Sequence, residues 1–248
     1  MAQIIKIGFG IVILGLGLTF NSPEVIANND IVISGGTTQS QFRDLTEQLG
    51  LAISYMPLAP AESLGLLGFD AGIEITAVNI DQSKSVWGNV IPDGSIPDYI
   101  YLPKLHVQVG LPLRLDVGAV YSKMPDSNIS MVGGELKWAF IEGGAAMPAL
   151  ALRGSYTKLL GVSDMDLNTY GLDLSISKGI TFLTPYAGVG MVWITSRNHS
   201  STTLDSEQVN RAKGFVGLRI SILHFISLVA EADFSAIQAY SLRLNASF

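Results

Sequence analysis

The sequence predicts an all-β fold: an antiparallel up-and-down transmembrane β-barrel of about ten strands with a short N-terminal amphipathic helix. Three observations predict it. Apolar residues alternate with polar residues or glycine through most of the chain, which is the period of a β-strand. About ten such segments recur, each near the length of a tilted strand that crosses a bilayer. Beyond the first 27 residues, no stretch of the sequence is apolar for long enough to form a spanning helix.

Composition narrows the class of protein. Of 248 residues, 48% are hydrophobic and only 15% are charged, which is too apolar for a disordered chain. The formal net charge of −6 argues against a nucleic-acid partner, because such a partner requires a basic face. The absence of cysteine excludes disulfides, thiolate metal sites, thiol catalysis and lipid attachment through an N-terminal cysteine.

The first element is a secretory signal peptide. Lys6 precedes an apolar run over residues 7–20, and Val25-Ile26-Ala27 fits a small-residue cleavage site. The run is shorter than the roughly 20 residues that a spanning helix needs. We therefore expect three parts: a signal peptide over residues 1–27, an N-terminal segment over 28–67 and the barrel over 68–248.

An amphipathic helix is the next expected element, within residues 37–63. Phe42, Leu45, Leu49 and Ala52 recur at helical spacing, Thr38 with Gln41 offers a capping box, and Pro57 and Pro60 end the helix. An alternative makes residues 51–58 an extra strand. The helix could plug the lumen, lie on the inner leaflet or sit at the periplasmic mouth; the simplest interpretation is that it covers the open bottom of the barrel.

The strands follow where apolar residues share one parity. They are expected at residues 69–77, 105–109, 113–121, 135–140, 150–157, 170–177, 187–193, 216–222, 226–234 and 240–248. Short links at 110–112, 143–148, 178–184 and 223–224 alternate with longer ones at 81–98, 122–128, 158–168 and 196–211. Short and long links alternate in this way when turns occupy one end of a barrel and loops the other. The link at 236–239 is the exception, because it is short where a loop is expected.

In the last expected strand, every second residue is apolar and is expected to face outward, and the series ends in an aromatic residue at the C-terminus. These residues are Tyr240, Leu242, Leu244, Ala246 and Phe248. This strand resembles the C-terminal strand of bacterial outer-membrane β-barrel proteins. The resemblance implies a location in the bacterial outer membrane and makes these five residues an assembly signal. It also implies outer-membrane lipid and the barrel-assembly machinery as partners. Because no nucleotide-binding glycine motif or metal-ligand cluster occurs in the sequence, we expect no cofactor.

Outward-facing aromatic residues are expected to form the two interfacial girdles of such a barrel. At the external strand ends lie Tyr101, Tyr121, Tyr156, Tyr170, Trp193, Phe234 and Tyr240, and at the periplasmic ends lie Phe69, Phe140 and Phe248. A soluble lipocalin-type barrel is the alternative, with the opposite polarity: apolar residues inside and charges outside.

The inward parity carries the charges. The expected lumen-lining residues are Asp70, Glu74, His106, Gln108, Arg114, Asp116, Glu135, Lys137, Arg153, Asp173, Arg219, Glu231, Asp233 and Arg243. Two interpretations remain open. The acids and bases could neutralise one another and fill the lumen. Alternatively, they could line a narrow, water-filled and slightly cation-preferring pore.

Catalytic patterns are weak. Asp164, Asp166 and His199 in external links resemble in part the rim aspartates and Asp-His pair of the ten-stranded omptin proteases, although the chain lacks an Asp-His dipeptide. We predict no catalytic site and no metal site. The expected function is a non-enzymatic structural barrel or a passive pore for small solutes. The alternatives are a surface protein that binds a partner through the 81–98 and 196–211 loops, the first with Trp87, and a rim hydrolase.

Overall fold

The computed structural model describes residues 31, 33–81, 83, 87, 98–125, 127–144, 146–200 and 202–248. The expected signal peptide at 1–27 and most of the 81–98 link lie outside them. Within the described residues, helix α1 (Gln39–Ile53) precedes ten strands. These are β1 (Phe69–Asn79), β2 (Tyr99–Leu111), β3 (Leu115–Lys123), β4 (Ser130–Ile141), β5 (Ala149–Leu160), β6 (Met165–Ser177), β7 (Leu183–Asn198), β8 (Glu207–Leu223), β9 (Ile226–Phe234) and β10 (Gln238–Ser247).

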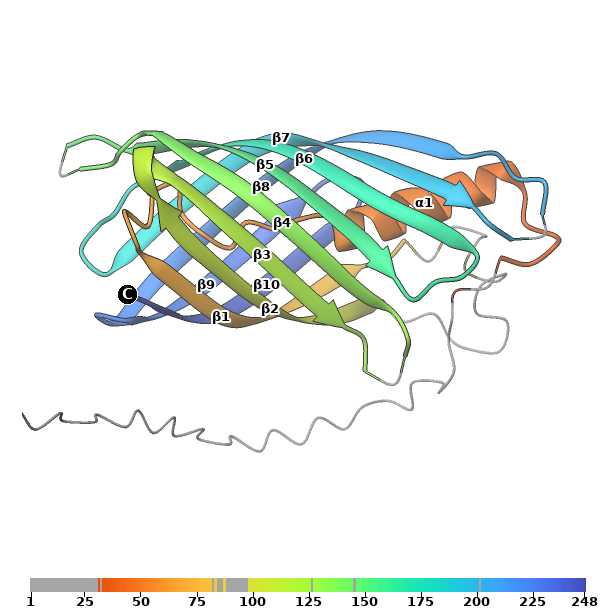
Figure 1. The fold of residues 1–248 in the computed structure, drawn as a ribbon, viewed down its shortest axis with the longest axis horizontal. Coiled ribbons are helices and arrows are strands. Elements are labelled where there is room, and N and C mark those ends of the chain that lie inside the picture. The colour runs from red at the N-terminus through yellow and green to blue at the C-terminus, as the bar shows by residue number, and fades with distance from the viewer. Residues whose placement is uncertain are drawn as a thin grey trace, which may run out of the picture.

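The strands form one closed antiparallel barrel, which confirms the predicted fold (Figure 1). Each strand pairs with its neighbours in sequence, and β1 pairs with β10 to close the sheet. At that seam, Phe69 and Phe248 exchange backbone hydrogen bonds of 3.0 and 2.8 Å, and Thr76 Oγ1 lies 2.9 Å from Ser241 Oγ. Closure leaves no unpaired sheet edge, which is a condition for surrounding the sheet with hydrocarbon.

The barrel has two different ends. The turn end holds Phe248, the start of β1 and the short links 112–114, 142–148, 178–182 and 224–225. The loop end holds the links 80–98, 124–129, 161–164, 199–206 and 235–237. Two loops are shorter than the sequence predicts, because β6 and β8 start early. Backbone pairing continues beyond the apolar band, and Asp166 on β6 lies in register with Arg197 on β7.

The outer surface of the barrel is apolar. Outward side chains such as Ile73, Leu105, Leu136, Val189 and Leu242 are exposed, while alternate residues are buried. The expected girdle residues Tyr101, Tyr121, Tyr156, Tyr170, Trp193, Phe234, Tyr240, Phe69 and Phe248 are also exposed, and Phe140 is half-buried. An apolar surface of this extent marks a membrane or protein contact. Its polarity is opposite to that of a lipocalin-type barrel.

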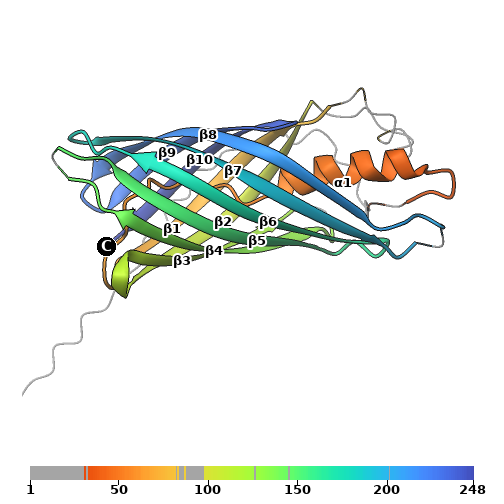
Figure 2. The same ribbon diagram turned by 90° about the horizontal axis from the view of Figure 1, so that it is seen from above.

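Helix α1 lies inside the barrel near the loop end, and the chain that follows it runs along the lumen to the turn end (Figures 1 and 2). The predicted capping box is confirmed, since Thr38 N donates to Gln41 Oε1 at 2.9 Å and Thr38 Oγ1 accepts from Gln41 N. The helix ends at Ile53, before both prolines, and residues 51–58 form no strand. Among the described residues, no helix is long and apolar enough to cross a membrane.

The expectation that the helix covers the bottom of the barrel was wrong. The helix lies at the opposite end because its buried face matches an apolar part of the wall there. Phe42, Leu45 and Leu49 belong to one apolar cluster with Leu167 and Ile194 of the wall. Gly50 permits this close packing, since a Cβ atom at that position would lie 2.3 Å from Ile194 Cγ2.

Candidate functional site: the filled lumen

Alternating parity places the charged residues of the strands inside the barrel. Twelve of the expected lumen-lining residues are buried there: Asp70, Glu74, His106, Gln108, Asp116, Glu135, Lys137, Arg153, Asp173, Glu231, Asp233 and Arg243. Arg219 is half-buried near the turn end, where its guanidinium donates to Ser227 Oγ at 3.1 Å and Ser247 Oγ at 2.7 Å. Together these thirteen side chains belong to nine strands, so the lumen wall is polar around most of its circumference.

Arg114 does not line the lumen. It lies in the turn Pro112–Arg114, where its side chain is 50% exposed and its Nε atom is 3.2 Å from Glu142 Oε1. Leu113 and Arg114 both have a φ of 63°, so the chain leaves the strand conformation at this turn. The alternation that predicts a lumen position applies only within a strand.

Two buried cations were missed by the sequence analysis. Lys104 on β2 and Lys213 on β8 are both buried in the lumen. Each lies on the inward parity of a strand whose predicted start was too late, at residues 105 and 216. Continuing the alternation of inward and outward positions a few residues toward the N-terminus of each strand would have predicted that both lysines face the lumen, since the strands begin at Tyr99 and Glu207.

Ion pairs tie the wall together across neighbouring strands. Lys104 Nζ lies 2.9 Å from Glu74 Oε1, and Arg153 Nε lies 2.5 Å from Glu135 Oε2. At the seam, Arg243 of β10 pairs with Asp70 of β1. All of these groups are nearly inaccessible to solvent, and a buried charge without a partner is costly. The pairs therefore allow a charged wall to exist inside a narrow barrel.

The segment from Ser54 to Gly68, here named the lumen strap, lies inside the lumen and contacts these charged side chains of the wall. Leu58 N donates to Glu231 Oε2 at 3.0 Å, and Arg243 Nη1 donates to Leu58 O at 3.3 Å. Lys137 Nζ donates to Pro60 O and to Glu62 O, at 3.2 and 2.8 Å. Charged wall groups thus satisfy the backbone of an irregular segment, which would otherwise carry unpaired polar groups.

Tyr55 joins the strap to the wall through a buried chain of hydrogen bonds. Its hydroxyl lies 2.6 Å from His106 Nε2, and His106 Nδ1 lies 3.2 Å from Glu74 Oε2. Its carbonyl oxygen accepts from Lys213 Nζ at 2.5 Å. A hydroxyl, an imidazole and a carboxylate in series also occur in catalytic triads. Here all three are buried within the packed lumen, so the arrangement fixes the strap and offers no access to a substrate.

The helix is anchored at the loop end by further pairs. Arg43 Nη1 lies 2.8 Å from Glu207 Oε2. The Arg211 guanidinium donates to both carboxylate oxygens of Glu47, at 2.7 and 2.5 Å. Before the helix, Ile33 N donates to Asp164 Oδ2 at 2.9 Å. The described part of the N-terminal segment is therefore held from one end of the lumen to the other.

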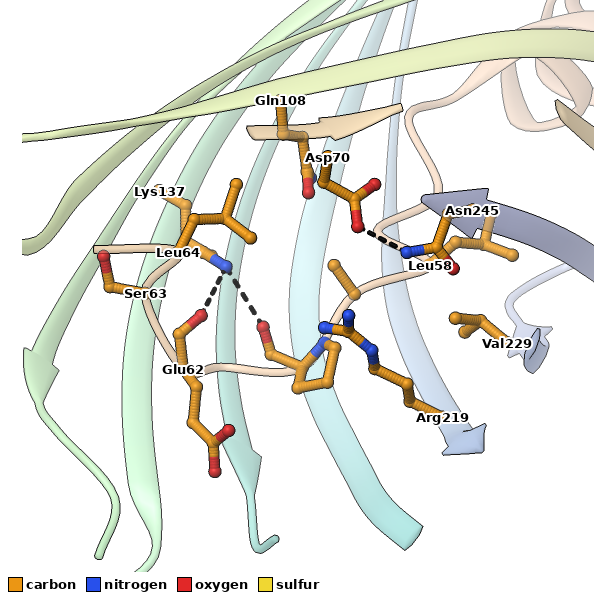
Figure 3. Close-up of a pocket in the computed structure, with 12 residues that line it drawn as sticks. Leu58, Glu62, Ser63, Leu64, Asp70, Gln108, Lys137, Arg219, Val229 and Asn245 are labelled. Carbon is orange, nitrogen blue, oxygen red and sulfur yellow. Dashed lines mark hydrogen bonds between the residues drawn. The ribbon is translucent and has the colours of Figure 1, made fainter. Parts of the chain in front are cut away.

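The helix and the strap leave little free space. A cavity of about 70 Å³ remains beside the strap in the half of the lumen toward the turn end. Leu58, Lys137 and Arg219 are among its lining residues (Figure 3). A water molecule needs about 10–15 Å³ of such volume, so the cavity is large enough for several water molecules. In the described part of the lumen, the helix and the strap otherwise pack against buried side chains of the wall.

At the loop end, Asp166 and His199 meet on the outer side of the barrel. His199 Nε2 lies 2.9 Å from Asp166 Oδ2, and both side chains are about half exposed. Asp164, the other residue of the expected rim pair, accepts the hydrogen bond from Ile33. His224 lies in the turn between β8 and β9. Within the described ranges, no group of three or more acidic or histidine side chains could hold a metal ion.

Comparison with known proteins gives structural likeness only. No family model matches the chain, and no curated relative matches it. Similar solved structures include the outer membrane protein OprG of Pseudomonas aeruginosa, with 11% identity over 77% of this chain and 99% of that one, at a TM-score of 0.37. Ail of Yersinia pestis matches with 11% identity over 72% and 99%, at 0.34. Neisserial surface protein A matches with 6% identity over 73% and 95%, at 0.31.

The assignment of the fold rests on the topology of the barrel itself. Its strands are consecutive and antiparallel, its seam is closed, and its outer face is apolar. The described part of the chain is a closed ten-stranded antiparallel β-barrel, and its structural neighbours are bacterial outer-membrane β-barrel proteins.

Proposed function

We propose that this protein is a non-enzymatic structural barrel of the bacterial outer membrane, closed by its own N-terminal segment. The observation that carries the proposal is the occupied lumen, in which helix α1 and the strap pack against wall side chains and a cavity of about 70 Å³ lies beside the strap. An open pore would need a continuous water path, and charges along the wall set selectivity only where such a path exists. Here Lys137, Glu231 and Arg243 bind the strap, and Arg153 pairs with Glu135 of the neighbouring strand.

The proposed orientation follows from the two ends of the barrel. The turn end, with Phe248 and the start of β1, faces the periplasm, and the loop end faces outward. The apolar outer face, the exposed aromatic residues on it and the predicted signal peptide support this placement. Outer-membrane lipid is then the main partner of the barrel surface.

Planar-bilayer recording tests the closed state directly. The refolded mature chain, residues 28–248, should insert into the bilayer and give no discrete current steps, because its lumen lacks a continuous water path. Incorporation is verified by a gel-mobility shift between folded and heated protein. Stable steps that scale with the amount of inserted protein would contradict the proposal and favour a passive solute pore.

A surface-binding role is a second candidate. The loop end carries an ordered polar surface, in which Gln39 bonds to Glu207 at 2.5 Å and His199 bonds to Asp166. Trp87 of the 81–98 loop is buried, and its indole donates to Gln48 Oε1 at 3.3 Å. This tryptophan therefore packs on the helix and does not present its ring to a partner.

If the protein binds a surface partner, shortening the 199–206 loop should abolish its binding to cells or matrix while the barrel still folds.

The C-terminal phenylalanine provides a test of the proposed assembly signal. Phe248→Ala should lower the amount of protein in the outer membrane several-fold and leave more of it in the periplasm, measured by fractionation and immunoblotting. Phe225→Ala is the matched control, because the Phe225 ring stacks on Phe248 with centroids 6.4 Å apart. That control removes the stacking contact and keeps the C-terminal residue. An equal loss in both variants would mean that ring packing, and not recognition of the C-terminus, determines the yield.

A further inference from the structure

The N-terminal segment crosses the lumen in one direction. Ile33 bonds to Asp164 in the 161–164 loop, and Gln39 bonds to Glu207 beside the 199–206 loop. Both contacts lie at the loop end. Farther along the chain, Leu64 N donates to Asp116 at 3.2 Å, and Leu67 N donates to Gly110 O at 3.1 Å. These later contacts lie at the turn end, where β1 starts (Figure 2).

The intermediate contacts follow the same order. Glu47 pairs with Arg211, which lies four residues into β8 from the loop end, and the Tyr55 carbonyl accepts from Lys213, two residues farther along the same strand. Leu58 then bonds to Glu231 in the lumen. Ala61 N then donates to Ser177 Oγ at 3.1 Å, at the last residue of β6. Sequence order and depth in the barrel therefore agree from Ile33 to Gly68. The segment cannot be a loop that enters and leaves through the same mouth.

From this path we propose that the barrel carries the N-terminus of its own mature chain across the outer membrane and displays it on the cell surface. The inference rests on the proposed orientation, in which the loop end faces outward. Cleavage of the predicted signal peptide after Ala27 would leave the new N-terminus only a few residues before Ile31. Before assembly this N-terminus lies in the periplasm, because export delivers the whole mature chain there. After assembly it is outside.

The packed lumen limits when this crossing takes place. Phe42 and Leu58 are almost completely buried, and the strap fills the space between the wall side chains. A finished barrel with this interior has no room for a second passage of the helix, which is about 10–12 Å across with its side chains. The segment therefore enters while the β1–β10 seam is still open or the lumen is still empty. Placement of the N-terminus therefore precedes the final packing of the lumen.

Single-cysteine labelling in living cells tests the proposal, since the native chain contains no cysteine. Gly36→Cys lies before the helix, in open space at the loop end, and Gly144→Cys lies in open space in a turn at the opposite end. Ser163→Cys, in the exposed link between β5 and β6, reports the side on which the loop end lies. The probe is a maleimide attached to a polymer too large to enter through porins.

On intact cells we expect Gly36→Cys and Ser163→Cys to label, and Gly144→Cys to label only after the outer membrane is opened, a difference of at least tenfold. If Ser163→Cys labels and Gly36→Cys does not, the proposal is overturned while the orientation of the barrel stands. If Gly144→Cys labels and Ser163→Cys does not, the proposed orientation is wrong and the display of the N-terminus on the cell surface is overturned with it, whereas the closed lumen is tested separately by planar-bilayer recording. Gel-shift analysis of each variant verifies that the barrel is folded.

A second arm tests transport of the N-terminus without relying on one position. A flexible epitope peptide inserted between Asn28 and Asn29 should be bound by antibody on intact cells and removed by external protease. The same peptide inserted after Gly144 should be bound only after permeabilisation. Protection of the N-terminal epitope in intact cells, in a barrel that passes the gel-shift analysis, would contradict the proposal.

Discussion

Arg243→Met is expected to destabilise the barrel by about 3–5 kcal/mol, the range seen when one partner of a buried ion pair is removed. Arg243 is 1% exposed and pairs with Asp70 across the β1–β10 seam. The same guanidinium donates to Leu58 O of the lumen strap. Methionine fills much of the volume but leaves the Asp70 carboxylate with Asn245 as its remaining side-chain partner. The measurement is urea unfolding of the refolded protein in lipid vesicles, followed by gel mobility.

Two variants separate the charge effect from general damage to the seam. Ser241→Ala removes the hydrogen bond to Thr76 at the same seam and should cost only about 1 kcal/mol. Asp70→Asn combined with Arg243→Met should recover part of the lost stability, because it removes the unpaired buried charge. Equal losses in Arg243→Met and Ser241→Ala would show that the ion pair does not hold the seam.

Much of the barrel could be predicted from the sequence because a strand between lipid and lumen obeys a strict period of two. Ile73 and Glu74 differ by one position and lie in opposite environments, one exposed on the outer face and one buried in the lumen. The capping box at Thr38 and Gln41 was equally accessible, since it depends only on contacts three residues apart. Both signals are local.

The contacts between residues far apart in the sequence could not be predicted. The position of helix α1 depends on pairs such as Arg43 with Glu207 and Glu47 with Arg211, which are separated by 164 residues. The parity of a strand likewise says that Lys137 faces inward, but not that it binds the carbonyls of Pro60 and Glu62. The prediction that Arg114 lines the lumen was wrong for a different reason. Leu113 and Arg114 both have a positive φ, so the alternation of inward and outward side chains ends before Arg114.

Deleting residues 31–64 should convert the silent barrel into a conducting one. The deletion removes helix α1 and most of the strap but keeps every strand and the seam. Of the wall residues that the structure describes, the inward acids are Asp70, Glu74, Asp116, Glu135, Asp173, Glu207, Glu231 and Asp233, and the inward bases are Lys104, Lys137, Arg153, Arg211, Lys213, Arg219 and Arg243. Water replaces the strap as their hydrogen-bonding partner, and the slight acidic excess should favour cations.

Planar-bilayer recording of this variant should therefore show discrete current steps, whereas the full mature chain shows none. Under a salt gradient across the bilayer, the reversal potential of this current should shift toward the equilibrium potential of the cation. Deletion of residues 28–36 is the matched control. It shortens the same segment but leaves Phe42, Leu45 and the strap in place, so the lumen should remain closed. A folded 31–64 deletion that stays silent would show that wall residues such as Phe215 and Tyr186 close the lumen by themselves. Apolar constrictions can do so by excluding water, and the N-terminal segment would then have a role other than closure.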